Sequence, residues 1–131
     1  MDHSVIIERL SILLHRQYNC LKDIQQVTRD LDNAIEREDG YSAEIILDER
    51  QDAILKLDQA RQDLLDYGEN HLEAQPIIAR LILSDPDNIL IEDENETIIK
   101  SLRLKNIELL RSLKLQDKVL NKKIAKDQSV Y

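Results

Sequence analysis

The chain has 131 residues, a net charge of −8 and an apolar content of 42%, with no tryptophan, no phenylalanine, two glycines and two prolines. A single domain spanning residues 1–131 is the expectation at this length, and the shortage of glycine and proline argues against a turn-rich β protein. The acidic balance argues against nucleic-acid binding, because a phosphate backbone attracts a basic surface. The one cysteine, Cys20, excludes an intrachain disulfide and any zinc site with two or more cysteines.

The first residues, Met-Asp-His-Ser, lack the basic and apolar segments of a secretory signal. The chain also contains no apolar run of about 18 residues, the minimum for a membrane-spanning helix. We therefore expect a cytoplasmic protein that does not insert into a membrane.

Apolar residues recur at helical spacing over residues 4–38, which predicts a long amphipathic helix. A helix of this length, about 50 Å, needs a partner along most of one side. The sequence Asp39-Gly40-Tyr41-Ser42 interrupts the pattern. We expect Gly40 to end the first helix in the left-handed conformation and Ser42 to cap the next one.

A second apolar stripe predicts a helix over residues 43–67, antiparallel to the first because the loop between them is short. Pro76 is suited to the first position of a short helix over residues 76–84. A turn is expected at residues 85–88. The third long helix is predicted over residues 96–126, so the expected fold is all-α. It is a long antiparallel helical hairpin with a third long helix, forming an elongated three-helix bundle with a short helical connection.

The last helix is basic in an otherwise acidic chain. From Lys100 to Lys126 there are nine basic and two acidic residues, a net charge of +7. One predicted face packs on the hairpin and consists of Ile98, Ile99, Leu102, Asn106, Leu109, Leu113, Gln116, Leu120 and Ile124. The opposite face carries further apolar residues among basic ones. They are Leu104, Ile107 and Leu115 among Lys100, Arg111, Lys114, Lys118 and Lys122. Leu110 and Val119 lie on the flanks between the two faces.

The second apolar face has several interpretations. Scattered exposed leucines are common on proteins, and the segment 76–84 is able to fold over this face. Alternatively, the face receives an amphipathic helix of another protein, for which the basic surround favours an acidic partner. A basic amphipathic helix can also lie on a membrane surface, although the remaining acidic chain opposes this.

No catalytic motif is present, so we expect no enzymatic activity, no cofactor and no metal. The three histidines lack the glutamate spacing of di-iron bundles, and the pattern His-Glu-x-x-His of zinc hydrolases is absent. Clustered carboxylates are suited in principle to Mg²⁺, but a solvated acidic face is the ordinary interpretation. These clusters are Glu36, Glu38 and Asp39, and Asp48, Glu49 and Asp52.

Two segments together resemble the FlgN/FliT-type flagellar export chaperones. The first is the hairpin corner, residues 38–42, followed by Ile46, Leu47, Arg50, Ile54, Leu55 and Leu57. The second is residues 105–113, which are similar to the late Asn-x-x-Leu-Leu pattern of that family. With the acidity and the all-helical order, the resemblance covers most of the chain.

The resemblance implies a cytoplasmic chaperone of bacterial flagellum biogenesis that binds the helical terminus of a secreted hook–filament junction or cap subunit. The family positions are Asn106, Leu109, Leu110 and Leu113. The helical faces add Leu104, Ile107, Arg111 and Leu115 as partner-binding candidates. The alternative is a self-assembling coiled-coil scaffold, in which the second face of the last helix forms a homodimer.

Overall fold

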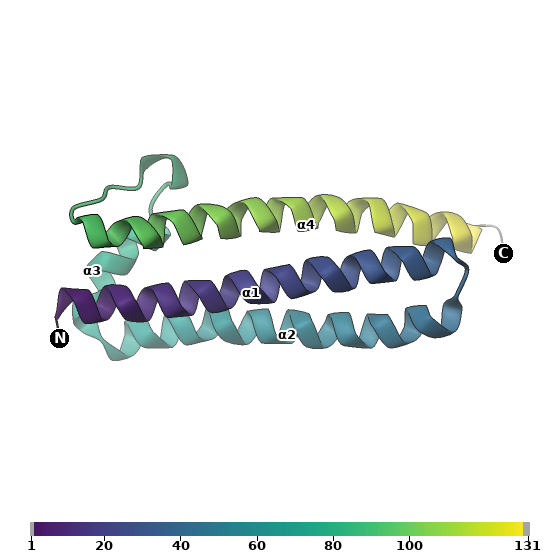
Figure 1. The fold of residues 1–131 in the computed structure, drawn as a ribbon, viewed down its shortest axis with the longest axis horizontal. Coiled ribbons are helices and arrows are strands. Elements are labelled where there is room, and N and C mark those ends of the chain that lie inside the picture. Colours follow the sequence, from purple (N-terminus) through teal and green to yellow (C-terminus); the bar gives the residue numbers. More distant parts are fainter. Residues whose placement is uncertain (1, 130–131) are drawn as a thin grey trace.

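The computed structural model describes the backbone of residues 2–129 and the side chains of residues 2–126. Three long helices run side by side in this part of the chain, which contains no strand (Figure 1). They are α1 (His3–Glu36), α2 (Gly40–Asn70) and α4 (Thr97–Ser129). The predicted all-α fold, a long hairpin with a third long helix and a short helical connection, is confirmed.

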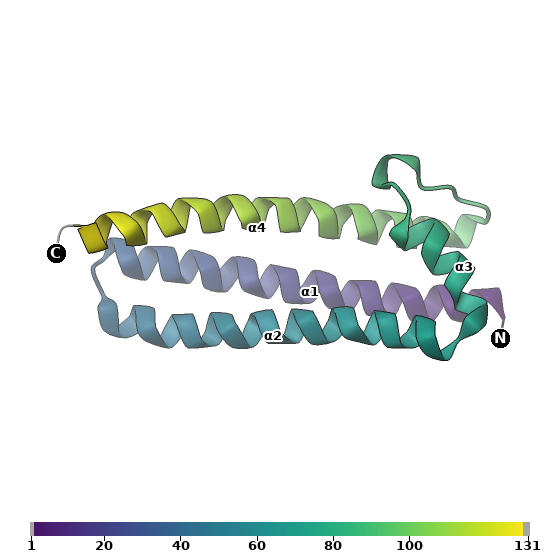
Figure 2. The same cartoon turned by 180° about the vertical axis from the view of Figure 1, so that it is seen from behind.

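The central helix of the bundle is α1. It lies between α2 and α4 in both views (Figures 1 and 2) and packs along each of them, whereas α2 and α4 approach each other much less closely. Ten residues of α1 are buried, compared with four of α2, as expected for a helix that is covered on two sides. Among the described residues, no long helix packs against the side of α4 that faces away from α1.

The turn between α1 and α2 differs from the expectation. Glu38, with a φ of 58°, takes the left-handed conformation, and the backbone N–H of Asp39 then reaches the carbonyl of Ala34 at 2.9 Å. The cap of α2 is Asp39, whose carboxylate accepts the Ser42 N–H at 3.1 Å. The roles expected for Gly40 and Ser42 were wrong, because the Asp39 carboxylate starts the helix three residues before Ser42.

The second helix continues through Gly68, beyond its predicted end. Gly68 is buried, and a Cβ atom at this position would lie 3.1 Å from Cδ1 of Ile78. The missing side chain therefore permits the short helix α3 (Gln75–Ile78) to cross close to α2 (Figure 2). A single π-helical turn, η2 (Ala79–Leu83), continues α3 and completes the short helical segment predicted over residues 76–84.

The remaining connections are short 3₁₀ turns. After α2 comes η1 (Leu72–Ala74), and the loop that leads into α4 contains η3 (Pro86–Asn88) and η4 (Glu94–Glu96). The turn expected at residues 85–88 forms, with the Asp85 carboxylate accepting the N–H of Asp87 at 3.0 Å. This loop projects from the bundle at the end where α4 begins (Figures 1 and 2).

The buried apolar residues form two clusters along the bundle. The larger one lies at the α3 end and includes Ile6, Ile7, Leu10, Leu13, Leu14, Leu64, Ala74, Ile78, Leu81, Ile89, Ile99 and Leu102. The smaller one joins all three long helices and consists of Leu21, Ile24, Leu57 and Leu113. Asn106 is also buried and donates a hydrogen bond from Nδ2 to the carbonyl of Leu14 at 3.1 Å. The Oδ1 atom of Asn106 has no hydrogen-bond partner among the described residues.

Candidate partner-binding surface

The outer face of α4 carries large apolar side chains. Leu104 is 40% exposed and Leu115 is 62% exposed, and Val119 is exposed as well. The opposite side of α4 is buried against α1 through Ile99, Leu102, Asn106, Leu113 and Leu120. We define the outer face of α4 as Leu104, Glu108, Arg111, Leu115 and Val119.

The predicted partner-binding residues divide between this face and the interior. Leu104, Arg111 and Leu115 lie on the outer face and are exposed. The buried ones are Asn106 and Leu113, which hold α4 on α1. The half-buried ones are Ile107, Leu109 and Leu110, and the last two pack against the smaller core cluster.

The basic residues of α4 are mostly available to a partner. Five lysines form no ion pair with any described residue: Lys100, Lys105, Lys114, Lys118 and Lys122. Among the described residues, Arg111 forms an ion pair with Glu108, at 3.1 Å, and both side chains are exposed. Lys123 differs, because its Nζ atom donates to Asp32 at 2.7 Å and to Glu36 at 2.6 Å. These hydrogen bonds raise the pKa of Lys123.

The loop before α4 exposes apolar side chains although it is firmly held. Leu83 is 69% exposed and Leu90 is 68% exposed, while Ile89 is buried in the larger core cluster. Arg80 donates to the carbonyl of Leu90 at 2.7 Å. Arg103, which is buried, donates to the carbonyl of Leu81 at 3.2 Å and to the carbonyl of Ser84.

A buried carboxylate, Glu96, connects this loop to the π-helical turn η2 and to the start of α1. Arg80 holds it with two hydrogen bonds, Nη1–Oε1 at 2.6 Å and Nη2–Oε2 at 2.7 Å. Glu96 also accepts the N–H of Glu92 at 2.9 Å, and Nε2 of His3 lies 2.7 Å from its Oε2. The hydrogen bonds from Arg80 are the main cause that lowers the pKa of Glu96 from 4.5 to about 2.

Sequence reasoning missed this ion-pair network. Residues 85–96 form an acidic run before α4, and its last member, Glu96, is completely buried. The available signal was Arg80, the single charged residue within the apolar segment 77–83. A buried arginine needs an acceptor, and an acidic residue close to a helix start can supply it.

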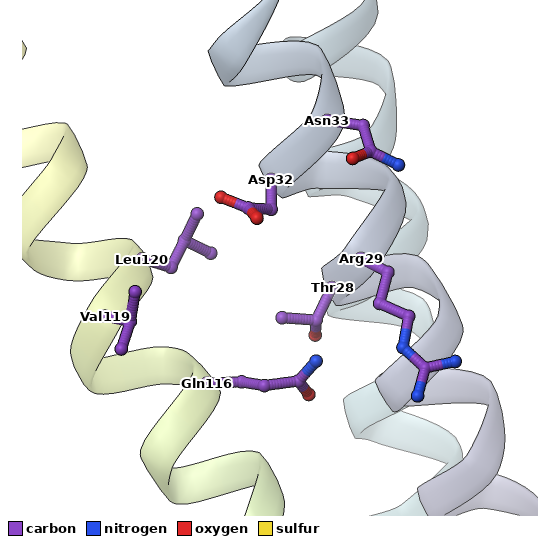
Figure 3. Close-up of a pocket in the computed structure, with 7 residues that line it drawn as sticks. All are labelled: Thr28, Arg29, Asp32, Asn33, Gln116, Val119 and Leu120. Atoms are coloured by element: carbon purple, nitrogen blue, oxygen red, sulfur yellow. The ribbon is translucent and has the colours of Figure 1, made fainter.

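A cleft lies between α1 and the C-terminal half of α4. Its volume is about 310 Å³, and it is lined by Thr28, Arg29, Asp32, Asn33, Gln116, Val119 and Leu120 (Figure 3). Figure 3 shows Gln116 pointing from α4 towards Thr28 of α1. The hydroxyl of Thr28 donates to the carbonyl of Ile24 at 2.6 Å, and Oε1 of Gln116 has no partner among the described residues. Leu120 is buried on one side of this cleft.

No grouping of three or more histidine, cysteine, aspartate or glutamate side chains suited to a metal occurs among the described residues. Cys20 is half-buried at the edge of the smaller core cluster, and burial raises the pKa of its thiol, which lowers its nucleophilic character.

No protein-family model, curated protein or solved structure matches this chain closely enough to be counted as similar. Within the described residues, no helix combines the length and the apolar character that crossing a membrane requires. The outer face of α4, with the exposed Leu104 and Leu115, is the feature on which the functional proposal depends.

Proposed function

We propose that this chain is a cytoplasmic chaperone of flagellar export, which binds the helical terminus of a secreted hook–filament junction or cap subunit. The observation that carries the proposal is the outer face of α4, where Leu104 and Leu115 are exposed on a regular helix between unpaired lysines. The resemblance to FlgN/FliT-type chaperones supplies the class of partner.

The binding mode is the packing of an amphipathic helix on an exposed helical face. Leu104 and Leu115 are eleven residues apart, about 16 Å along the helix axis, so each can contact one apolar position of a client helix three turns long. A client segment that is disordered when free loses conformational entropy on binding, and burial of its apolar stripe offsets this loss. The unpaired lysines favour a client with acidic residues beside that stripe.

The family positions have a supporting role in this proposal. Asn106 and Leu113 are buried against α1, and Leu109 and Leu110 pack against the smaller core cluster. They fix the rotation of α4 about its own axis, and this rotation decides which side chains face outward. The proposed role is binding, without a cofactor and without catalysis.

The test is an affinity experiment with three proteins, used as bait in a lysate of the source organism. The baits are the unchanged chain, the double variant Leu104→Asp/Leu115→Asp, and Leu55→Asp, which changes an exposed leucine of α2. The retained proteins are identified by mass spectrometry. Each candidate client is then expressed, and its terminal segment is titrated against the three proteins by calorimetry.

The proposal requires that a secreted flagellar subunit binds the unchanged chain and Leu55→Asp, but not the double variant. It is overturned if no such subunit is retained, or if the double variant binds the terminal segment as tightly as the unchanged chain does. Circular dichroism of all three proteins shows whether the helical fold is kept.

A further inference from the structure

The outer face of α4 has a two-fold pattern along the helix axis. At about 100° per residue, Leu104, Glu108, Arg111 and Leu115 fall within about 60° of one another around the helix. From the N-terminus the order of these residues is leucine, glutamate, arginine, leucine. Read from the C-terminus it is leucine, arginine, glutamate, leucine, so the two directions differ only in the sign of the two charges. We propose that a second copy of this chain covers this face, with its α4 antiparallel to the first and a two-fold axis between Leu109 and Leu110.

In this register Leu104, Glu108, Arg111 and Leu115 each meet a complementary residue of the second copy. Leu104 lies opposite Leu115 of the second copy, and Glu108 lies opposite Arg111 of the second copy. Two-fold symmetry repeats each contact, so four leucines and two pairs of opposite charges meet. Within one chain, the Glu108–Arg111 contact at 3.1 Å joins two exposed side chains three residues apart, a type of pair that contributes little to stability.

The distribution of charge along α4 selects the antiparallel direction. The exposed residues Glu92, Asp93 and Glu94 precede the helix, and Lys118 and Lys122 are exposed near its other end. An antiparallel partner places the acidic end of each copy beside the basic end of the other. A parallel partner would place Arg111 against Arg111 and the lysines against lysines, which is unfavourable.

The outer face lies on the side of α4 that is turned away from α1 and α2 (Figure 1). The buried residues of α4 point to α1, and α2 lies on the far side of α1 (Figure 1). The second copy would occupy the same face as the proposed client, so the client and the second copy compete. The dimer itself does not depend on the identity of the client.

A charge-exchange experiment on the full chain tests the register. The masses of the unchanged chain, Glu108→Arg, Arg111→Glu and the double variant Glu108→Arg/Arg111→Glu are measured by sedimentation equilibrium at low salt. Concentrations extend to about 200 μM, because weak interfaces dissociate at lower ones. The fold of each protein is checked by circular dichroism.

We expect dimers for the unchanged chain and for the double variant. Each single variant places like charges opposite each other twice, so its dimerisation is expected to weaken by at least about tenfold. The inference is overturned if the unchanged chain is a monomer throughout, if the single variants dimerise as strongly, or if the double variant stays monomeric.

Cross-linking gives a second readout of the register. In a Cys20→Ser background, Leu104→Cys and Leu115→Cys proteins are mixed and oxidised. The antiparallel register predicts a disulfide between the two different variants, whereas each variant alone has its two cysteines about 16 Å apart, beyond disulfide reach. Equal cross-linking of a variant with itself would contradict the proposed axis. Neither experiment uses a client, so a failure of the chaperone proposal leaves these results unchanged.

Discussion

Arg80 and Glu96 are paired by two parallel hydrogen bonds, 2.6 and 2.7 Å long, between the π-helical turn after α3 and the start of α4. The side chain of Glu96 is fully buried, while that of Arg80 is 18% exposed. The pair closes the end of the bundle where the projecting loop leaves and returns. Because Arg80 also donates to the carbonyl of Leu90, the pair links the backbone of the exposed Leu90 to the start of α4. Removal of the pair should therefore change the stability of the chain.

Replacing Glu96 with glutamine should lower the free energy of unfolding by about 3 kcal/mol. The reason is that the mostly buried guanidinium of Arg80 loses the negative charge of its buried partner. Chemical denaturation followed by circular dichroism measures this change. The matched control is Glu94→Gln, which alters an exposed carboxylate two residues away and should change stability by less than about 0.5 kcal/mol. Equal effects of the two substitutions would contradict the importance of the buried pair.

The same carboxylate predicts a specific dependence of stability on pH. Its pKa is lowered from 4.5 to about 2 in the folded chain. The stabilisation is therefore fully present above pH 4.5 and is lost as the pH falls towards 2, a total of about 3 kcal/mol for a shift of this size. Denaturation midpoints between pH 6 and pH 2 should fall more steeply for the unchanged chain than for Glu96→Gln. If the denaturation midpoints of the two proteins fall in parallel with pH, Glu96 is not the source of the pH dependence of stability.

The two glycines should respond in opposite directions to added side chains. Gly68→Val introduces branched atoms where even a Cβ would lie 3.1 Å from Ile78, so a loss of about 1–3 kcal/mol is expected. Gly40→Ala places its Cβ where no atom lies within 4 Å, in the first turn of α2, and should raise stability by about 0.4–1 kcal/mol. Thermal unfolding of both variants measures these effects. A stable Gly68→Val protein would mean that α3 does not cross α2 closely.

The two sides of α4 can be distinguished by a pair of leucines. Leu113 is 5% exposed within the smaller core cluster, and Leu113→Ala should cost about 2–4 kcal/mol. Leu115 points away from the bundle, and Leu115→Ala should cost less than about 0.5 kcal/mol. Urea denaturation at low protein concentration keeps self-association from contributing. A larger loss for Leu115 than for Leu113 would reverse the assignment of the faces.

The periodicity of the sequence was sufficient to predict the long helices and the inner side of α4, because Ile99, Leu102, Leu113 and Leu120 recur at helical spacing and are buried. Ile98 was placed on the same face but is 49% exposed. Adjacent residues of a helix are about 100° apart, so Ile99 takes the inward direction and its neighbour cannot. Hydrophobicity alone does not separate two such neighbours.

The polar contacts were harder to predict than the apolar ones. Leu104 and Leu115 were identified as outward-facing from spacing alone, and both are exposed. Arg103 and Glu96 are charged but buried, and their partners, Ser84 and Arg80, lie 19 and 16 residues away in sequence. The position of such a partner depends on how the loop folds back, and this loop has no periodic pattern from which its path follows.

The division of the interior into two apolar clusters has a consequence for local unfolding. The larger cluster holds the first turns of α4, whereas only Leu113 represents α4 among the buried residues of the smaller one. Amide hydrogens near Ile99 and Leu102 should therefore exchange with solvent deuterium more slowly than those near Leu120. The C-terminal half of α4 can then separate transiently from α1 while the end of the bundle around Arg80 and Glu96 stays closed.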